Sequence, residues 1–374
     1  MKIIFYFLSS RIMFLLFAVF ASLILPLREG YLGKSLGLSN QYLAWIWANF
    51  DGVHFLDIAS KGYNNFDFAF FPLYPLLVSF LSKIFHLSEL TTGILLSLIC
   101  LILSLFLVYK IVTVDFKEKV ARLTILLLLF SPYAFFYHSV YTESLFLLTT
   151  TASLYFARRK HWIWSGIFGM LAILTRLAGV SLIPALCAEW YIQNRKGLQI
   201  NSKTFLDFFS GVGLAILICG LGLVFYMMYL KFFFGDALLF QKSMVAWNQS
   251  SFVLLPQVIF RYFRIFLNVE PLNLVYSIAI LEFLSFFLYL WLSIYTLFKI
   301  RLSYGIYMIV LLILVTFTGT FAGTPRYITH LFPAFLALAV IVDDNKFLRF
   351  EIAVFYLLLG FTLTTLFTRG NFIT

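Results

Sequence analysis

Residues 90–109 have the sequence LTTGILLSLICLILSLFLVY, which contains no charged side chain. About 20 mainly apolar residues in a helix are enough to cross the hydrocarbon core of a membrane. Apolar residues make up 62% of the 374-residue chain and charged residues 11%, whereas soluble domains contain roughly 45–50% and about 25%. The sequence therefore predicts a membrane protein built from several helices of this kind.

Other apolar runs lie along the rest of the chain, at 12–27, 68–85, 123–137, 144–157, 161–175, 177–191, 205–230, 272–298, 304–321, 327–342 and 351–367. The run 68–85 contains Pro72 and Pro75 near its start, and proline interrupts helical hydrogen bonding. We expect this run to be interfacial or re-entrant, or else simply kinked, and the others to give about 11 crossings. The predicted fold is all-α and polytopic, with a single integral membrane domain over residues 1–374.

The positive charges predict which side each loop lies on. Of the 27 Lys and Arg residues, 16 fall in six short connecting segments, 1–11, 110–122, 158–160, 192–204, 299–303 and 343–350. The positive-inside rule places these segments in the cytoplasm, which puts the N-terminus inside and the C-terminus outside. Residues 28–89 then form a first outer loop and 231–271 a second large one. Because the basic residues form no continuous face, the net charge of +11 does not predict nucleic-acid binding.

The first outer loop contains Asp51, His54 and Asp57, which fall within an arc of about 120° on a helix. A solvated polar face is one interpretation. A metal site is a second, but spacings of three and six residues spread these side chains along two turns, so a divalent metal is possible without being favoured. A carboxylate general base that deprotonates a hydroxyl is the third. The three cysteines lie inside apolar runs without CxxC spacing, which supports neither a disulfide framework nor a zinc site.

More polar residues fall on the same predicted outer side. Glu143 either caps the following helix or belongs to a site. Arg176 and Arg326 lie beside apolar runs, where arginine either snorkels to the interface or binds a phosphate with two parallel hydrogen bonds. Asp236 and Trp247 lie in the second outer loop, and an aromatic ring there is suited to stacking on a sugar. Together these positions predict one outward-facing pocket.

The order of several motifs resembles a known family. Asn49-Phe-Asp-Gly-Val-His-Phe-Leu-Asp, followed by Phe68-Ala-Phe-Phe-Pro-Leu-Tyr-Pro, resembles the first outer loop of the mannosyltransferases that add the second mannose in glycosylphosphatidylinositol assembly (PIG-V type) and of their prokaryotic relatives. These enzymes belong to the C-type (GT-C) superfamily of membrane glycosyltransferases. Later blocks are similar in the same order: Tyr141-Thr-Glu-Ser, Leu174-Thr-Arg-Leu, Phe234-Gly-Asp-Ala with Trp247-Asn, and Thr324-Pro-Arg-Tyr. The resemblance covers roughly residues 40 to 340.

The resemblance implies inverting transfer of a hexose, mannose by analogy, from a polyprenyl-phosphate (dolichyl-phosphate-type) donor to a hydroxyl of a lipid-linked or glycan acceptor. It implies Asp51 as catalytic base and Arg176 and Arg326 as ligands of the donor phosphate. Supporting roles fall to His54, Asp57, Glu143, Asp236, Trp247, Asn248 and Tyr327. Phe50 stands where relatives often have Trp, and Ala237 where they often have Pro. Neither departure removes a charged group.

The implied partners are therefore the lipid donor, the acceptor and membrane lipids, with no certain cofactor and no nucleic acid. The implied location is the cell membrane of a prokaryote or the endoplasmic reticulum membrane of a eukaryote, with the active site on the outer or lumenal face. No phosphate-binding GxxxxGKS loop is present. A transporter or flippase of a lipid-linked saccharide remains the alternative. Such folds often contain inverted repeats, and the absence of a repeat here favours the enzyme.

Overall fold

A computed structural model of the chain describes residues 2–28, 42–64, 66–195, 202–247, 249, 253–271 and 273–373. Within these ranges the chain is helical and contains no strand, which confirms the all-α prediction. The longer helices are α1 (Lys2–Ile24), α3 (Asp51–Lys61), α4 (Leu73–Phe85), α5 (Glu89–Val112), α6 (Glu118–Leu129), α7 (Glu143–Arg158), α8 (Trp162–Thr175), α9 (Leu182–Asn194), α11 (Leu214–Phe234), α13 (Leu255–Asn268), α14 (Leu274–Tyr295), α15 (Leu302–Thr316), α17 (Phe332–Val342) and α18 (Lys346–Thr368).

Short helical segments connect or extend the longer ones. They are α2 (Tyr42–Trp45), α10 (Ser202–Phe208), α12 (Leu239–Lys242), α16 (Thr324–Tyr327), the 3-10 helices η2 (Asp67–Ala69), η3 (Ala134–His138), η4 (Leu177–Ser181), η7 (Ser243–Trp247) and η9 (Ile328–His330), and the π-helical turns η6 (Phe209–Gly213) and η8 (Thr296–Ile300). Several of these segments interrupt what would otherwise be one longer helix. The interruptions create helix ends inside the bundle, and charged side chains can be placed there.

Five of the described helices are long and apolar enough to cross a membrane, namely Lys2–Ile24, Glu89–Val112, Phe205–Phe234, Leu274–Ile300 and Lys346–Thr368. A bent pair, Thr324–His330 with Phe332–Val342 at 81°, adds a sixth candidate. The chain is an integral membrane protein, and the count of about 11 crossings remains a prediction. The 13-residue α4 is too short to be counted among the full spans.

The first helix begins earlier than the apolar pattern predicts. Arg11 was expected in a cytoplasmic segment but lies inside α1, where its guanidinium donates to the carbonyl of Ala134 at 3.0 Å. A second guanidinium contact, at 2.9 Å, reaches Nδ1 of His138. A charge within a span is tolerated when polar groups of the protein surround it, and here the buried turn η3 supplies them.

Close packing of α8 against α11 depends on small residues. A Cβ added at Gly166 would lie 2.7 Å from the carbonyl oxygen of Ala215, and one at Gly222 would lie 2.6 Å from that of Met170. Both distances are shorter than a side chain tolerates. Small residues at such contacts let the backbones of membrane helices approach each other.

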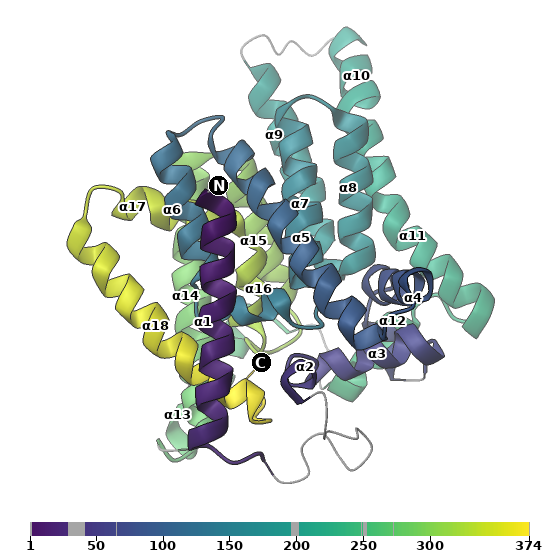
Figure 1. Ribbon diagram of the computed structural model, residues 1–374. Coiled ribbons are helices and arrows are strands. Elements are labelled where there is room, and N and C mark those ends of the chain that lie inside the picture. The colour runs from purple at the N-terminus through teal and green to yellow at the C-terminus, as the bar shows by residue number, and fades with distance from the viewer. Residues whose placement is uncertain are drawn as a thin grey trace.

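The two ends of the bundle differ in what they contain. In Figure 1 the N-terminus and α10 lie at the upper end, while α2, α3 and α12 lie at the lower end. Helices α7, α8 and α9 run between the two ends, and α7 contacts both α8 and α9. The lower end contains the first predicted outer loop, and the upper end contains segments predicted to be cytoplasmic.

Candidate active site

Asp51 is the first residue of α3, and its position is fixed by the residues before it. Phe50 has φ 54°, in the left-handed region that side chains other than glycine rarely adopt. The side-chain amide of Asn49 donates to the backbone carbonyl of Phe367 at 2.9 Å, and the backbone carbonyl of Asn49 accepts from the Tyr141 hydroxyl at 2.7 Å. Contacts from distant parts of the chain thus hold a strained turn beside the candidate base, a combination that occurs often at functional sites.

The partner of Asp51 is Arg326. Nη1 of Arg326 donates to Oδ2 of Asp51 at 2.7 Å, and the side chains are only 10% and 16% exposed. Arg326 lies in α16, whose turn begins after Gly323 (φ 77°) with Pro325 in its first positions. Its guanidinium also lies 5.4 Å from the ring centre of Tyr141. A charge-assisted bond in such a dry setting is stronger than one in water.

Glu143 connects the two predicted phosphate ligands. Its Oε1 accepts from Nη2 of Arg176 at 2.8 Å and lies 3.3 Å from Nε of Arg326. Nε of Arg176 donates to the Thr142 hydroxyl at 2.6 Å. Tyr327 stacks near both cations, with its ring centre 4.8 Å from the Arg176 guanidinium carbon and 5.4 Å from that of Arg326. Asp51, Glu143, Arg176, Arg326 and Tyr327 therefore form one group, which we call the outer cluster after the side of the membrane that the sequence predicts for it.

The outer cluster is only partly satisfied. Oε2 of Glu143, Nη1 of Arg176 and Nε of Arg326 are buried without a hydrogen-bond partner among the described residues. Both ring nitrogens of the fully buried His330 are unpartnered within the same part of the chain. Buried polar groups are nearly always hydrogen-bonded, so a group of unsatisfied atoms needs an explanation. Donors and acceptors left unsatisfied in this way are available to a bound ligand.

Three predicted site residues lie outside the outer cluster. His54 contacts Asp67 at 2.8 Å and stacks on Phe70, and Asp57 is paired with Lys61 at 2.7 Å on an exposed face of α3. Asp236 binds Lys242, whose ammonium lowers the pKa of the carboxyl below its ordinary value. Asn248 and the side chain of Trp247 lie outside the described residues.

Two residues of this region were not singled out by the sequence pattern. Thr142 binds Arg176, and His330 lies with its ring centre 4.6 Å from that of Phe146 and 6.2 Å from that of Tyr327. A lone histidine in the apolar run 327–342 is a signal that could have identified His330. Among the described residues, no three His, Cys, Asp or Glu side chains converge as a metal site.

Comparison with known proteins gives the fold. The family model of dolichyl-phosphate-mannose-protein mannosyltransferases matches residues 71–222. A structure of ArnT from Cupriavidus metallidurans bound to undecaprenyl phosphate superposes with a TM-score of 0.53 at 17% identity, covering 97% of this chain and 63% of ArnT. The chain has the C-type glycosyltransferase fold. Apo ArnT from the same organism gives a TM-score of 0.50 at 14% identity, with 95% and 62% coverage.

The chain spans less than two thirds of the length of the ArnT structures that it matches. A comparison with curated protein sequences finds no match. At this level of identity the comparison establishes the C-type fold, while activity and substrates have to be argued from the site.

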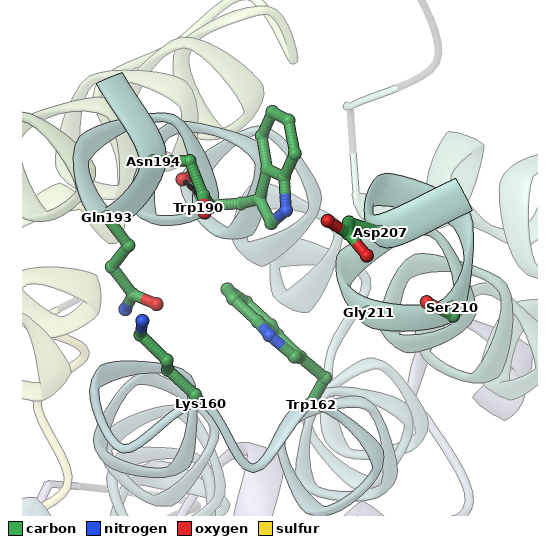
Figure 2. A pocket seen from close by; sticks show the side chains of 8 residues that line it. All are labelled: Lys160, Trp162, Trp190, Gln193, Asn194, Asp207, Ser210 and Gly211. Atoms are coloured by element: carbon green, nitrogen blue, oxygen red, sulfur yellow. Dashed lines mark hydrogen bonds between the residues drawn. The ribbon is translucent and has the colours of Figure 1, made fainter. Parts of the chain in front are cut away.

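A hollow of about 330 Å³ lies at the opposite end of this C-type bundle. Its lining consists of Lys160, Trp162, Trp190, Gln193, Asn194, Asp207, Ser210 and Gly211. In Figure 2 Lys160 and Gln193 point toward each other on one side of it, and Trp190 and Asp207 approach each other on another. None of the predicted site residues lines this hollow. Paired indoles near predicted cytoplasmic charges are typical of the membrane interface.

Proposed function

We propose that this chain is an inverting membrane glycosyltransferase that moves a hexose from a polyprenyl-phosphate donor to a hydroxyl of a lipid-linked or glycan acceptor. The observation that carries the proposal is the outer cluster. It combines a carboxylate held at a helix start, two arginines and several unsatisfied buried atoms at one end of a C-type fold.

The proposed reaction assigns one role to each part of the cluster. The acceptor oxygen attacks the anomeric carbon of the donor sugar and loses its proton to Asp51. The bond between that carbon and the phosphate oxygen breaks, and polyprenyl phosphate leaves. Arg176 and Arg326 stabilise the negative charge that develops on the phosphate. A single displacement inverts the configuration at the anomeric carbon.

The arrangement of the arginines adds a condition to this scheme. Arg326 contacts both Asp51 and Glu143, and Arg176 contacts Glu143. The donor phosphate is a further anion. It must therefore accept hydrogen bonds from arginine N–H groups that do not contact a carboxylate, or from N–H groups that break their contact with a carboxylate when the phosphate binds. Among the described residues, Nη1 of Arg176 has no partner and is a donor of the first kind. Nε of Arg326, 3.3 Å from Oε1 of Glu143, is a donor of the second kind. We therefore propose that donor binding rearranges the cluster around Glu143.

The lipid donor is supported by two similarities. The matched family is described as using dolichyl phosphate mannose, and the similar ArnT structure holds undecaprenyl phosphate. Mannose is our proposed sugar, following the PIG-V type motifs. The positive-inside rule supports a site on the outer or lumenal face, in the cell membrane of a prokaryote or the endoplasmic reticulum of a eukaryote. The scheme requires no metal step.

The test is a donor comparison with purified protein in liposomes. We expect transfer from a polyprenyl-phosphate hexose to a lipid or glycan acceptor, with mannose preferred over glucose, and none from a nucleotide sugar alone. A carboxylate variant on the same predicted side, Glu89→Gln in the first turn of α5, is the matched control and should keep activity. Turnover of a nucleotide sugar without lipid carrier would reject the donor assignment. Movement of labelled lipid-linked sugar across the bilayer without a new glycosidic bond would favour the transporter alternative.

A further inference from the structure

Helix α13 (Leu255–Asn268) presents three different faces. Its polar residues follow spacings of four, three and four, which places them on one side of the helix; they are Gln257, Arg261, Arg264 and Asn268. Val258 and Tyr262 form the buried face, which packs in a cluster with Phe321. The helix is therefore not a simple half-buried helix of a soluble bundle.

The third face of α13 is apolar and exposed. Phe260 is 61% exposed, Phe263 52% and Leu267 83%, and their spacing of three and four residues aligns them in a stripe. An exposed apolar stripe next to an arginine stripe is typical of a helix that lies in the plane of the membrane interface. Figure 1 places α13 at the same end of the bundle as α2 and α3, which is the end of the outer cluster.

The arginine stripe borders a hollow of about 420 Å³. Its lining is Arg261, Arg264, Ile265, Asn268 and Val269, and we call it the α13 hollow. Within the described part of the chain the Arg264 guanidinium has no ion-pair partner, and Arg261 donates only one bond, from Nη1 to the carbonyl of Gly319 at 2.8 Å. Residues three apart are neighbours on a helix surface, so both guanidinium groups can reach one anion.

We propose that the α13 hollow binds the phosphate of an anionic membrane lipid. The guanidinium fork matches phosphate oxygens. Asn268 also lines the hollow, and its side-chain amide donates to the Arg264 carbonyl at 2.7 Å. The exposed Phe260, Phe263 and Leu267 lie among the acyl chains, which places the two arginines at headgroup level. This site is separate from the donor phosphate site of the outer cluster and does not depend on the proposed transfer.

The bound lipid also acts on the segment that supports Arg326. Besides the Arg261 bond to Gly319, the amide of Phe321 donates to the Tyr262 hydroxyl at 3.1 Å, and this hydroxyl contacts Thr320 at 3.2 Å. The segment from Gly319 leads directly into Gly323 and α16. Because a guanidinium has five N–H donors, Arg261 holds Gly319 and a phosphate together, so that the lipid orders this segment.

The test counts lipids bound to the purified full chain in detergent by native mass spectrometry, without sugar donor. We expect tighter retention of phosphatidylglycerol than of phosphatidylcholine. Arg261→Gln with Arg264→Gln should weaken phosphatidylglycerol binding roughly 30-fold, about fivefold for each arginine near a membrane surface. The control, Arg28→Gln with Lys83→Gln, removes two exposed positive charges at other places on the same predicted side and should leave binding unchanged.

Two further measurements, amide hydrogen exchange and binding of inorganic phosphate, distinguish lipid binding from the alternatives. Amide hydrogen exchange of Gly319 to Gly323 should slow when phosphatidylglycerol is added to the wild type and stay constant in the double arginine variant. Exchange of the α5 amides at the wild-type rate shows that the variant remains folded. Equal retention of both lipids, or undiminished phosphatidylglycerol binding in the variant, overturns the proposal. If inorganic phosphate binds as tightly as phosphatidylglycerol, the hollow is a site for a free anion instead of a lipid.

Discussion

Glu143 and Glu189 are both buried carboxylates with two arginines close by, and they occupy different ends of the helices that carry them. Glu143, 0% exposed, begins α7 and contacts Arg176 and Arg326. Glu189, 1% exposed, lies in the second half of α9 and contacts Arg301 and Arg158. The two sites use the same residue types, but they differ in how completely the carboxylate is satisfied.

Both oxygens of Glu189 are saturated. Oε1 accepts from Arg301 at 2.6 Å and from Gln193 at 2.7 Å, and Oε2 accepts from Arg301 at 2.8 Å and from Ser303 at 2.7 Å. Arg158 in turn makes a two-pronged contact with Asp115. We call Asp115, Arg158, Glu189, Arg301 and Ser303 the inner cluster. It joins α7, α9 and α15, and each carboxylate oxygen of Asp115 and Glu189 accepts a hydrogen bond from an arginine.

In the part of the chain that the structure describes, Oε2 of Glu143 has no hydrogen-bond partner, and neither do Nη1 of Arg176 and Nε of Arg326. Burying a charge costs free energy unless hydrogen bonds compensate for it. The inner cluster is compensated by protein groups, which is the pattern of a structural connection. The outer cluster lacks full compensation, which is the pattern of a site completed by substrate. The two clusters therefore differ in how far their charges are satisfied, more than in which charges are present, and this difference is why we propose the outer cluster as the site.

The largest effect is expected at Asp51. Asp51→Asn keeps the shape of the side chain but removes the proton acceptor, so transfer should fall roughly 10²- to 10⁴-fold. The measurement is turnover of purified protein, with the melting temperature recorded alongside. Near-normal turnover in Asp51→Asn would remove Asp51 from the mechanism and would make the outer cluster a second structural connection.

The two arginines of the outer cluster should give the next largest losses. Arg176→Gln and Arg326→Gln remove the charge that stabilises the leaving phosphate, and loss of one such donor costs roughly 10²- to 10³-fold in rate. Lysine keeps the charge but loses the planar fork, so each Lys variant should fall between Arg and Gln. Turnover at saturating lipid donor gives the ranking. Equal activity of Arg, Lys and Gln at both positions would contradict phosphate binding.

Much of the helical framework could be predicted from the sequence, because apolar runs and their ends are local features. The run 144–157 corresponds to α7 (Glu143–Arg158), and 161–175 corresponds to α8 (Trp162–Thr175). The proline-containing run 68–85 contains the 13-residue α4, and its interfacial or re-entrant position remains a prediction. Arg11 was misplaced because an arginine satisfied by Ala134 and His138 looks like a loop charge when its partners are unknown.

The pairing of the charges could not be predicted. Asp51 and Arg326 are 275 residues apart, and a single sequence does not show how distant helix ends meet. For the same reason Arg158 and Arg301 were counted only as cytoplasmic charges, although both contact Glu189. Glu189 itself is an isolated acid within the apolar run 177–191. Such a residue is a recognisable sign of a buried polar contact.

Glu189 should affect stability instead of rate. Glu189→Gln leaves the partly buried Arg301 without its counter-ion, and breaking a buried ion pair costs about 3–5 kcal/mol, an upper value for a pair with one partly buried member. The melting temperature should therefore fall, while the protein that remains folded keeps its turnover number. The matched control is Glu118→Gln, which breaks an exposed pair with Arg122 at 3.3 Å and should cost about 0.5 kcal/mol or less. A loss of turnover without a loss of stability would assign the inner cluster to catalysis.

The last test determines on which side of the membrane each cluster lies, and its substitutions should perturb the protein least. Lys61 and Lys242 are 68% and 65% exposed near the end of the outer cluster, whereas Asp344 is 99% exposed in a segment predicted to be cytoplasmic. Single cysteines at these positions should leave fold and activity nearly unchanged. Cys100 and Cys219 are buried and Cys187 is partly buried, so labelling of the wild type gives the background to subtract.

In intact cells or sealed vesicles of known orientation, an impermeant thiol reagent on the outside should label Lys61→Cys and Lys242→Cys but not Asp344→Cys. The opposite pattern would place the outer cluster in the cytoplasm, where nucleotide sugars are available, and the outward-facing lipid-donor proposal would fail with it.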